Sequence, residues 1–181
     1  MEQRNSFSII VRYMRNILIL GAGKSSIVLI DYLVKHAEEQ QWEVTVADIS
    51  AELALQKTKG RKHTYAIAFN FNDKAGRKAL IKAADIVISM LPATMHITLA
   101  HDCLALKKNL VTPSYISDAM RALNKEAKAK GLVFMNEMGL DPGIDHMSAM
   151  QMIHRLKKDG KVVTGFKSHC GGLVAPENDD N

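Results

Sequence analysis

The sequence has few cysteines and no long hydrophobic run. Two cysteines among 181 residues, Cys103 and Cys170, are too few for a disulfide framework and fit a reducing compartment. No stretch approaches the roughly 18 uninterrupted apolar residues of a membrane helix, so we predict no membrane span. The apolar run at residues 7–14 is interrupted by Ser8 and Arg12 and lacks a small-residue cleavage site, which argues against a signal peptide. We therefore expect a cytoplasmic protein.

Glycine and proline are also scarce, with 11 and 4 residues, which excludes collagen-like and linker compositions. Hydrophobic residues make up 47% of the chain, too many for a disordered protein. The net charge is only +5, and the lysine pairs stand at expected helix ends rather than in a basic stripe, so nucleic-acid binding has little support. Histidine and cysteine residues lack the spacing of a zinc site, and we predict no metal.

Short apolar runs alternate with longer amphipathic segments along most of the chain. The first run, 16–20, is continuously apolar after Asn16 and leads into a glycine, which is typical of a buried parallel strand. Strands that alternate with helices predict an α/β fold, a doubly wound parallel sheet of the Rossmann type with right-handed crossovers. The expected strands are 16–20, 43–48, 65–71, 85–90, 110–113 and 132–135; the expected helices are 25–40, 50–59, 74–83, one that ends at 107, and 117–130. Ser50 and Asp73 are the expected N-caps of the second and third helices.

The pattern changes after residue 135. A loop rich in Gly, Asp and Pro (136–145) precedes an expected helix (144–158) whose methionines we expect to pack in a core, and a strand is expected at 161–170. We divide the chain into an N-terminal extension (1–13), a dinucleotide-binding domain (14–138) and the start of a second, α+β substrate domain that is cut short (139–181). Residues 7–13 are alternatively an extra strand or helix. A truncated chain of this kind exposes apolar surface, so we expect association, for example as a homodimer, or instability.

A glycine-rich turn follows the first strand and opens the first helix, as the dinucleotide fingerprint requires. Gly21 allows the tight turn, Gly23 lets the backbone approach a pyrophosphate, and the helix N-terminus offers N–H groups to the phosphate charge. Ser26 stands where the fingerprint has its third glycine, which weakens close packing of helix and strand without excluding it. The candidate phosphate-binding residues are Gly21, Ala22, Gly23, Lys24, Ser25 and Ser26.

An acid ends the second expected strand. The carboxylate of Asp48 can accept hydrogen bonds from the adenosine ribose and repels a 2′-phosphate, so the sequence predicts NAD(P) binding with NAD favoured over NADP. Arg61 and Lys62 lie further along and could reach a 2′-phosphate, which leaves this preference open. Alternatively, Asp48 only caps the following turn. At the end of the fourth strand, main-chain groups of Ser89, Leu91 and Pro92 are expected near the nicotinamide-side ribose, unless this stretch is a simple strand-to-helix turn.

Two motifs resemble one family. The sequence Gly-Leu-Asp-Pro-Gly-Ile-Asp-His at 139–146, preceded by Met-Asn-Glu at 135–137, resembles the hallmark of saccharopine dehydrogenases of the glutamate-forming type. Residues 168–177 resemble the family's second hallmark, with His169 in place of Tyr and Val174 in place of Pro, and the Ser114-Tyr115 pair matches too. The resemblance covers about residues 15–181.

The resemblance implies a chemistry and roles for particular residues. Family members join aminoadipate semialdehyde and glutamate through an imine that NAD(P)H reduces to saccharopine, in lysine metabolism, and they are much longer than this chain. Ser114, Tyr115 and Asp141 would then bind the small-molecule substrate, with Leu140 and Pro142 beside the nicotinamide. We assign catalytic roles to Asp141 and to His146, the nearest candidate proton carrier. For His146 the alternative is a structural role at a helix start, and for the whole chain it is a non-catalytic dinucleotide-binding module or truncated remnant.

Overall fold

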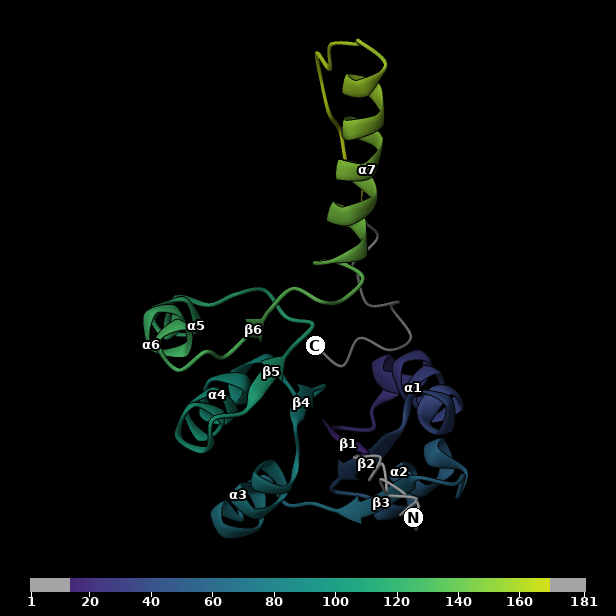
Figure 1. The fold of residues 1–181 in the computed structure, drawn as a ribbon, viewed down its shortest axis with the longest axis vertical. Helices are drawn as coiled ribbons and strands as arrows, with labels where there is room; N and C mark the ends of the chain where they lie inside the picture. The colour runs from purple at the N-terminus through teal and green to yellow at the C-terminus, as the bar shows by residue number, and fades with distance from the viewer. Residues whose placement is uncertain (1–13, 170–181) are drawn as a thin grey trace, which may run out of the picture.

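A computed structural model describes residues 14–169 and contains one parallel sheet (Figure 1). The strand order is β3-β2-β1-β4-β5-β6, and every neighbouring pair is parallel. The order reverses between β1 and β4, which is the switch point where doubly wound sheets bind ligands at their carboxyl ends. The strands are β1 (Arg15–Leu20), β2 (Trp42–Asp48), β3 (Thr64–Ala68), β4 (Ile86–Ser89), β5 (Asn109–Val111) and β6 (Phe134–Met135).

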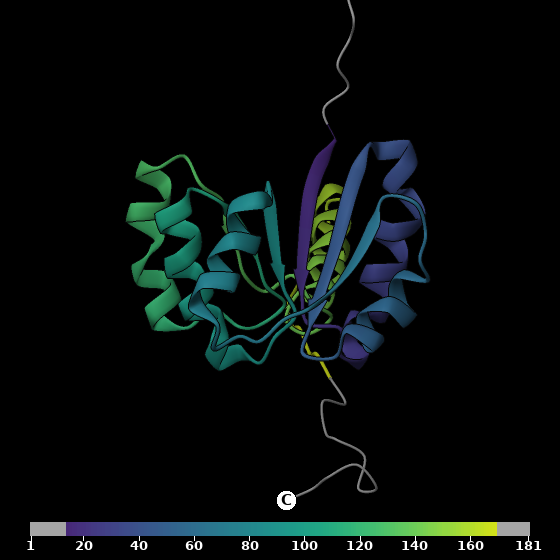
Figure 2. The same ribbon diagram turned by 90° about the horizontal axis from the view of Figure 1, so that it is seen from below.

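Helices cover both faces of the sheet, as Figure 2 shows, and the expected Rossmann-like fold is confirmed. Side chains of a strand alternate between faces, so Ile17 and Ile19 of β1 pack beneath α1 and α2, whereas Leu18 and Leu20 pack on the side of α3 and α4. The helices are η1 (Lys24–Ser26, a 3-10 turn), α1 (Ile27–Gln40), α2 (Ala51–Thr58), α3 (Lys74–Ala83), α4 (Ala93–Leu106), α5 (Asp118–Ala122), α6 (Asn124–Ala129) and α7 (Ile144–Lys158).

Local capping explains where several helices begin. The side chain of Ser50 accepts a hydrogen bond from the Leu53 amide and starts α2, as the sequence predicts. Asp73 accepts from the amides of Ala75 and Gly76 and starts α3 in the same way. Within residues 14–169, no helix has the length and apolar character needed to cross a membrane.

Three expected elements differ from the structure. The helix expected at 117–130 is two short helices, α5 and α6, separated at Leu123. The strand expected at 65–71 ends at Ala68, because Asn70 then turns the chain by accepting a hydrogen bond from the Asn72 amide. Residues 161–169 form no strand, since no strand of the described region pairs with them. Residue 170 and the alternatives for 7–13 lie outside the described residues.

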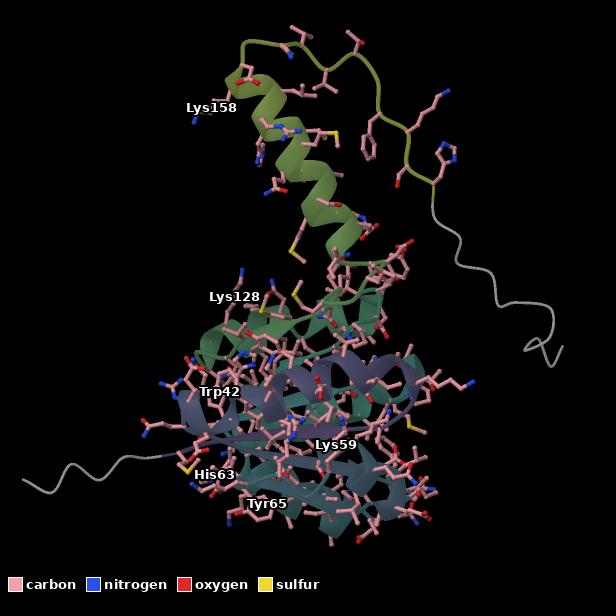
Figure 3. All side chains as sticks on the ribbon, turned by 90° about the vertical axis from the view of Figure 1, so that its right-hand side faces the viewer. Trp42, Lys59, His63, Tyr65, Lys128 and Lys158 are labelled. Atoms are coloured by element: carbon pink, nitrogen blue, oxygen red, sulfur yellow. The ribbon has the colours of Figure 1, made fainter. Side chains whose placement is uncertain are left out.

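Helix α7 leaves the layered domain and projects away from the sheet (Figure 1). Lys158 lies at its far end in Figure 3. None of its residues is buried in the described part of the chain, and Met147 and Met150 are 55% and 46% exposed. The expectation that these methionines pack in a core is therefore wrong for residues 14–169: the helix carries an apolar stripe but no described element packs on it.

Candidate functional site

The glycine-rich turn lies at the carboxyl end of β1, beside the end of β4. Gly21 has φ 103°, and a Cβ there would stand 2.8 Å from the Met90 carbonyl oxygen, so only glycine fits this approach. A Cβ on Gly23 would meet nothing within 4 Å. The first glycine is therefore required by the packing of the turn against the chain after β4, whereas the space beside the second glycine is open.

Ser26 fits the third glycine position because its small side chain bonds within the turn. Its hydroxyl is buried and donates to the Gly23 carbonyl oxygen at 2.9 Å. The Lys57 ammonium group, from α2, also donates to the Gly23 carbonyl and approaches the Ser26 hydroxyl at 3.2 Å. Desolvation lowers the pKa of Lys57, and the charge of Asp48 opposes that shift. Sequence reasoning missed Lys57, because nothing in its local pattern indicates a contact 34 residues away.

Asp48 lies at the end of β2 and already holds the turn. One carboxylate oxygen accepts from the Ala22 amide at 2.6 Å, and the other accepts from the Ser50 amide at 3.0 Å. Arg61 and Lys62 precede β3 and so lie near the amino ends of the strands, whereas Asp48 lies at the carboxyl end of β2. Arg61 approaches Asp31 and Lys62 pairs with Glu38, both on α1. The two cations that the sequence left as candidates for a 2′-phosphate therefore both have an acid of α1 as a neighbour.

A pocket of about 250 Å³ opens beside Asp48, between the ends of β2, β3 and β4. Phe71, one of the residues that line this pocket, is held by Arg77 of α3. The Arg77 guanidinium stacks 4.8 Å from the Phe71 ring centre and donates to the Phe71 carbonyl. Arg77 in turn pairs with buried Asp102 of α4 at 2.7 Å. The pocket is lined by Asp48, Ile49, Phe69, Asn70, Phe71, Asn72, Leu91, Pro92 and Met95.

A buried histidine joins two residues that the sequence analysis selected separately. Ser89, at the end of β4, has its hydroxyl 2.9 Å from Nδ1 of His96 on α4. Nε2 of the same ring lies 2.8 Å from the hydroxyl of Ser114, which follows β5. Burial lowers the pKa of His96 and so favours the neutral ring. Sequence reasoning missed His96, although its place in the first turn after Ser89–Pro92 offered a signal.

The 139–146 motif folds into a closed loop after β6. The Ile144 amide donates to the Gly139 carbonyl at 3.0 Å, and a Cβ on Gly143, whose φ is 151°, would lie 2.1 Å from that oxygen. Amides of Glu137 and Met138 donate to the carbonyls of Ser114 and Thr112, which ties the loop to the segment after β5. Gly143 is thus required by close backbone contact, whereas a Cβ on Gly139 would lie 3.1 Å from the Pro113 carbonyl oxygen, a tight but less severe approach.

This anchoring brings the candidate substrate residues together. The Tyr115 hydroxyl donates to the Asp141 carboxylate at 2.7 Å, and both side chains are exposed. Leu140 is also exposed, whereas Pro142 is buried. His146, in the first turn of α7, has Nδ1 2.7 Å from Asp145. Although partial desolvation opposes the shift, hydrogen bonds from Gly143 and His146 lower the pKa of Asp145.

The candidate residues therefore form two groups along the carboxyl edge. One surrounds the glycine-rich turn and Asp48, with Leu91 and Pro92 in the wall of its pocket; the other links Ser89 through His96 to Ser114, next to Tyr115 and Asp141. In residues 14–169 no three His, Cys, Asp or Glu side chains are placed to hold a metal ion.

The chain is similar to known proteins in sequence and in fold. Residues 17–135 match the family model of the saccharopine dehydrogenase NADP binding domain, and residues 139–181 match that of the saccharopine dehydrogenase C-terminal domain. The chain is 39% identical over 167 residues to saccharopine dehydrogenase [NADP(+), L-glutamate-forming] from Pyricularia oryzae, covering 92% of this chain and 36% of that protein. It is 37% identical to alpha-aminoadipic semialdehyde synthase from Arabidopsis thaliana, covering 91% and 17%.

Solved structures agree. Apo saccharopine dehydrogenase (L-Glu forming) from Saccharomyces cerevisiae superposes with a TM-score of 0.76 at 35% identity, covering 92% of this chain and 37% of that chain. A 3-ketoreductase from Actinomadura kijaniata, solved with NADP, has a TM-score of 0.60 at 17% identity over 81% of this chain and 44% of its own, and shares the fold alone. The chain thus spans about a third or less of the relatives' length, and because the first family model covers residues 17–135, it belongs to the saccharopine dehydrogenase family.

Proposed function

We propose that residues 14–138 form a domain that binds NAD(P) across the carboxyl edge of the sheet. The observation that carries this proposal is the contrast between Gly21, which is closed in by Met90 after β4, and Gly23, where a Cβ would meet nothing within 4 Å. The adenosine would occupy the pocket beside Asp48 and the pyrophosphate would lie over residues 21–26. The nicotinamide would then extend toward Ser89, Leu91 and Pro92, with Leu140 and Pro142 beyond.

We further propose that this domain prefers NADH to NADPH. An Asp48 carboxylate at the ribose position repels a 2′-phosphate. Lys62 pairs with Glu38 of α1, Arg61 lies 4.0 Å from Asp31 of the same helix, and the ammonium group of Lys57 donates to the Gly23 carbonyl and lies 3.2 Å from the Ser26 hydroxyl. The relative from Pyricularia oryzae is an NADP(+) enzyme by name, so this preference would distinguish the chain from it.

Fluorescence titration of the chain with NADH and with NADPH tests both statements. Saturable binding that is tighter for NADH supports them, and absence of binding by either cofactor contradicts the first. Because Asp48 also holds the Ala22 amide, Asp48→Ala weakens the turn for both cofactors, and only the ratio of the two dissociation constants reports on the 2′-position. We expect the dissociation constant for NADPH to fall relative to that for NADH. Glu52→Gln, which removes an exposed acid from the first turn of α2, serves as the control.

For a longer protein that contains this chain, we propose the glutamate-forming saccharopine dehydrogenase reaction. A bound nicotinamide supplies the hydride acceptor or donor. The carboxylate of Asp141, oriented by the Tyr115 hydroxyl, would bind an amine of the substrate, and Ser114 would contact the substrate next to it. His146 would carry a proton, with Asp145 holding its ring. The protein would then work in lysine metabolism, with the second domain beginning at residue 139.

Saccharopine-dependent reduction of NAD(P)+ by the longer protein tests this assignment. Asp141→Asn is expected to raise KM for saccharopine, since the charge on the amine loses its partner. His146→Asn is expected to lower kcat and to remove one limb of its pH profile, whereas a structural role at the start of α7 would leave that profile unchanged. Binding of cofactor without any saccharopine turnover would favour the alternative of a non-catalytic dinucleotide-binding module. The cytoplasmic location and the homodimer stay predictions.

A further inference from the structure

Ser89, His96 and Ser114 form a hydrogen-bonded chain that runs from the buried end of β4 to the open end of β5. Ser89 is fully buried, His96 is 4% exposed, and Ser114 is partly exposed. We propose that His96 is a positioning residue: it fixes the hydroxyl of Ser114 as a hydrogen-bond donor toward the ligand, so that this position selects an acceptor oxygen. The inference deepens the proposed function and rests on it for the identity of the ligand.

The direction of the chain follows from the buried end. A neutral imidazole has one nitrogen that donates and one that accepts. If Nδ1 donated to Ser89, the Ser89 hydroxyl hydrogen would need a second acceptor, and the described residues provide this hydroxyl with His96 alone. A buried hydroxyl hydrogen without an acceptor costs free energy, whereas a hydroxyl that donates to Nδ1 is satisfied. Nδ1 is therefore the acceptor, and the ring proton resides on Nε2.

The open end of the chain is fixed as a consequence. Nε2–H donates to the Ser114 hydroxyl oxygen at 2.8 Å, and the backbone amide of Ser114 is already bonded to the Thr112 hydroxyl. The hydroxyl hydrogen of Ser114 is then directed away from His96. Burial of the ring lowers the pKa of His96 and so favours the neutral ring on which this direction of the chain depends. A serine on an open loop could donate or accept equally well, but here the buried end decides.

A donor at this point selects a carboxylate or carboxamide oxygen. Under the proposed function two groups with such an oxygen reach this edge: the carboxamide of the nicotinamide and a carboxylate of an amino-acid substrate. An ammonium group would have to share the Ser114 hydroxyl oxygen with Nε2–H, and it would leave the Ser114 hydroxyl hydrogen without an acceptor. Ser114 and Asp141 would therefore bind different groups of the ligand. The Asp141 carboxylate, which accepts from the Tyr115 hydroxyl next to Ser114, offers acceptor oxygens for a substrate amine.

The tautomer of His96 is measured directly by long-range ¹⁵N–¹H NMR spectra of the 181-residue chain with labelled histidine. We expect a pyridine-type signal for Nδ1 and a pyrrole-type signal for Nε2, without any ligand. His101→Gln, an exposed position on the same helix, should leave that pattern unchanged and helps to assign it. Ser89→Ala removes the donor to Nδ1 and should increase the population with a proton on Nδ1. A proton on Nδ1 in the unaltered chain would overturn the proposal, whether or not the chain binds a nucleotide.

The ligand half is tested by binding. Ser114→Ala should weaken one acceptor contact by about three- to tenfold, the usual effect of one hydrogen bond, and Ser114→Thr, which keeps the hydroxyl, should restore most of it. A loss for NADH but not for ADP-ribose identifies the carboxamide. A loss confined to glutamate, titrated into the NADH complex, identifies a carboxylate. Unchanged binding of both ligands to Ser114→Ala would overturn the acceptor assignment. Failure of the unaltered chain to bind NADH and ADP-ribose would instead contradict the proposed function, while the NMR result still decides the role of His96.

Discussion

The buried ion pair of Arg77 and Asp102 stabilises the packing of α3 on α4, and Arg77 also contacts Phe71 in the lining of the pocket beside Asp48. The side chains of Arg77 and Asp102 are 7% and 9% exposed, and the contact joins α3 to α4 at 2.7 Å. Replacing Arg77 with methionine keeps most of the packing volume but leaves the Asp102 carboxylate buried. Breaking a buried ion pair in this way costs about 3–5 kcal/mol of the free energy of unfolding. Because Lys78 remains 3.8 Å from Asp102, we expect the lower end, about 3 kcal/mol.

Urea denaturation followed by circular dichroism measures this loss. With a urea m-value of about 2 kcal/mol/M, a loss of about 3 kcal/mol lowers the midpoint by about 1.5 M. The double variant Arg77→Met, Asp102→Leu removes both charges and should recover most of the lost stability, since hydrophobic replacements of buried pairs are often neutral. Lys78→Met, which removes a half-exposed partner, is the control and should cost less than about 1 kcal/mol.

The same variant has a second consequence at the pocket. Arg77 stacks on the Phe71 ring and donates to the Phe71 carbonyl, so the loss of Arg77 removes the contacts that hold this wall of the pocket. We expect weaker binding of ADP-ribose by Arg77→Met, and the double variant should regain stability without regaining affinity. An Arg77→Met midpoint within 0.3 M of the original (about 0.6 kcal/mol at that m-value) would refute the reasoning, because an ion pair open to water would behave in that way.

Further predictions concern single residues. Gly21→Ala should destabilise the chain because its Cβ would meet the Met90 carbonyl at 2.8 Å, whereas Gly23→Ala should keep the unfolding midpoint and lose cofactor binding; the same denaturation and titration experiments compare the two. Lys57→Met should weaken binding of NADH and NADPH equally, because the group holds the turn rather than a 2′-phosphate, and a loss confined to NADPH would contradict this. Burial raises the pKa of the Cys103 thiol to about 12, so in a Cys170→Ser background iodoacetamide should modify Cys103 at pH 8 only after urea unfolding. Since the folded-state pKa of Cys103 lies above the unfolded value of 9.0, the buried neutral thiol contributes fully to the free energy of unfolding below pH 9. This contribution declines as the pH rises toward 12. A urea midpoint that is unchanged from pH 8 to pH 10 would contradict this prediction.

The sequence is informative where structure depends on neighbours along the chain. Ser50 and Asp73 are helix caps because their side chains reach amides two or three residues ahead, and the sequence locates both. Asp48 and the glycines of the turn are found because a strand end, a turn and a helix start follow one another in a fixed order. The parallel order of the sheet follows from the same alternation.

Prediction fails where the outcome depends on a distant partner. The methionines of α7 have helical spacing, but spacing cannot tell whether any element covers them, and here none in residues 14–169 does. Residues 161–169 have strand-forming composition but no neighbouring strand to complete the hydrogen bonds. The split at Leu123 and the pairing of Arg61 and Lys62 with α1 likewise depend on packing that a local pattern does not contain.

In both groups at the carboxyl edge, the residues expected to contact a ligand and the residues that position them come from different elements. Residues expected to touch a ligand, such as Gly23 and Ser114, lie three residues after the end of a strand and are visible in the sequence. The residues that hold them in place come from helices elsewhere: Lys57 of α2 bonds the carbonyl of Gly23, and His96 of α4 bonds the hydroxyl of Ser114. A contacting residue must lie at the sheet edge, so its position in the chain is constrained, whereas a positioning residue needs only reach and can come from any element that packs nearby. Motifs therefore locate the site, and only the fold reveals which side chains set the direction of its hydrogen bonds.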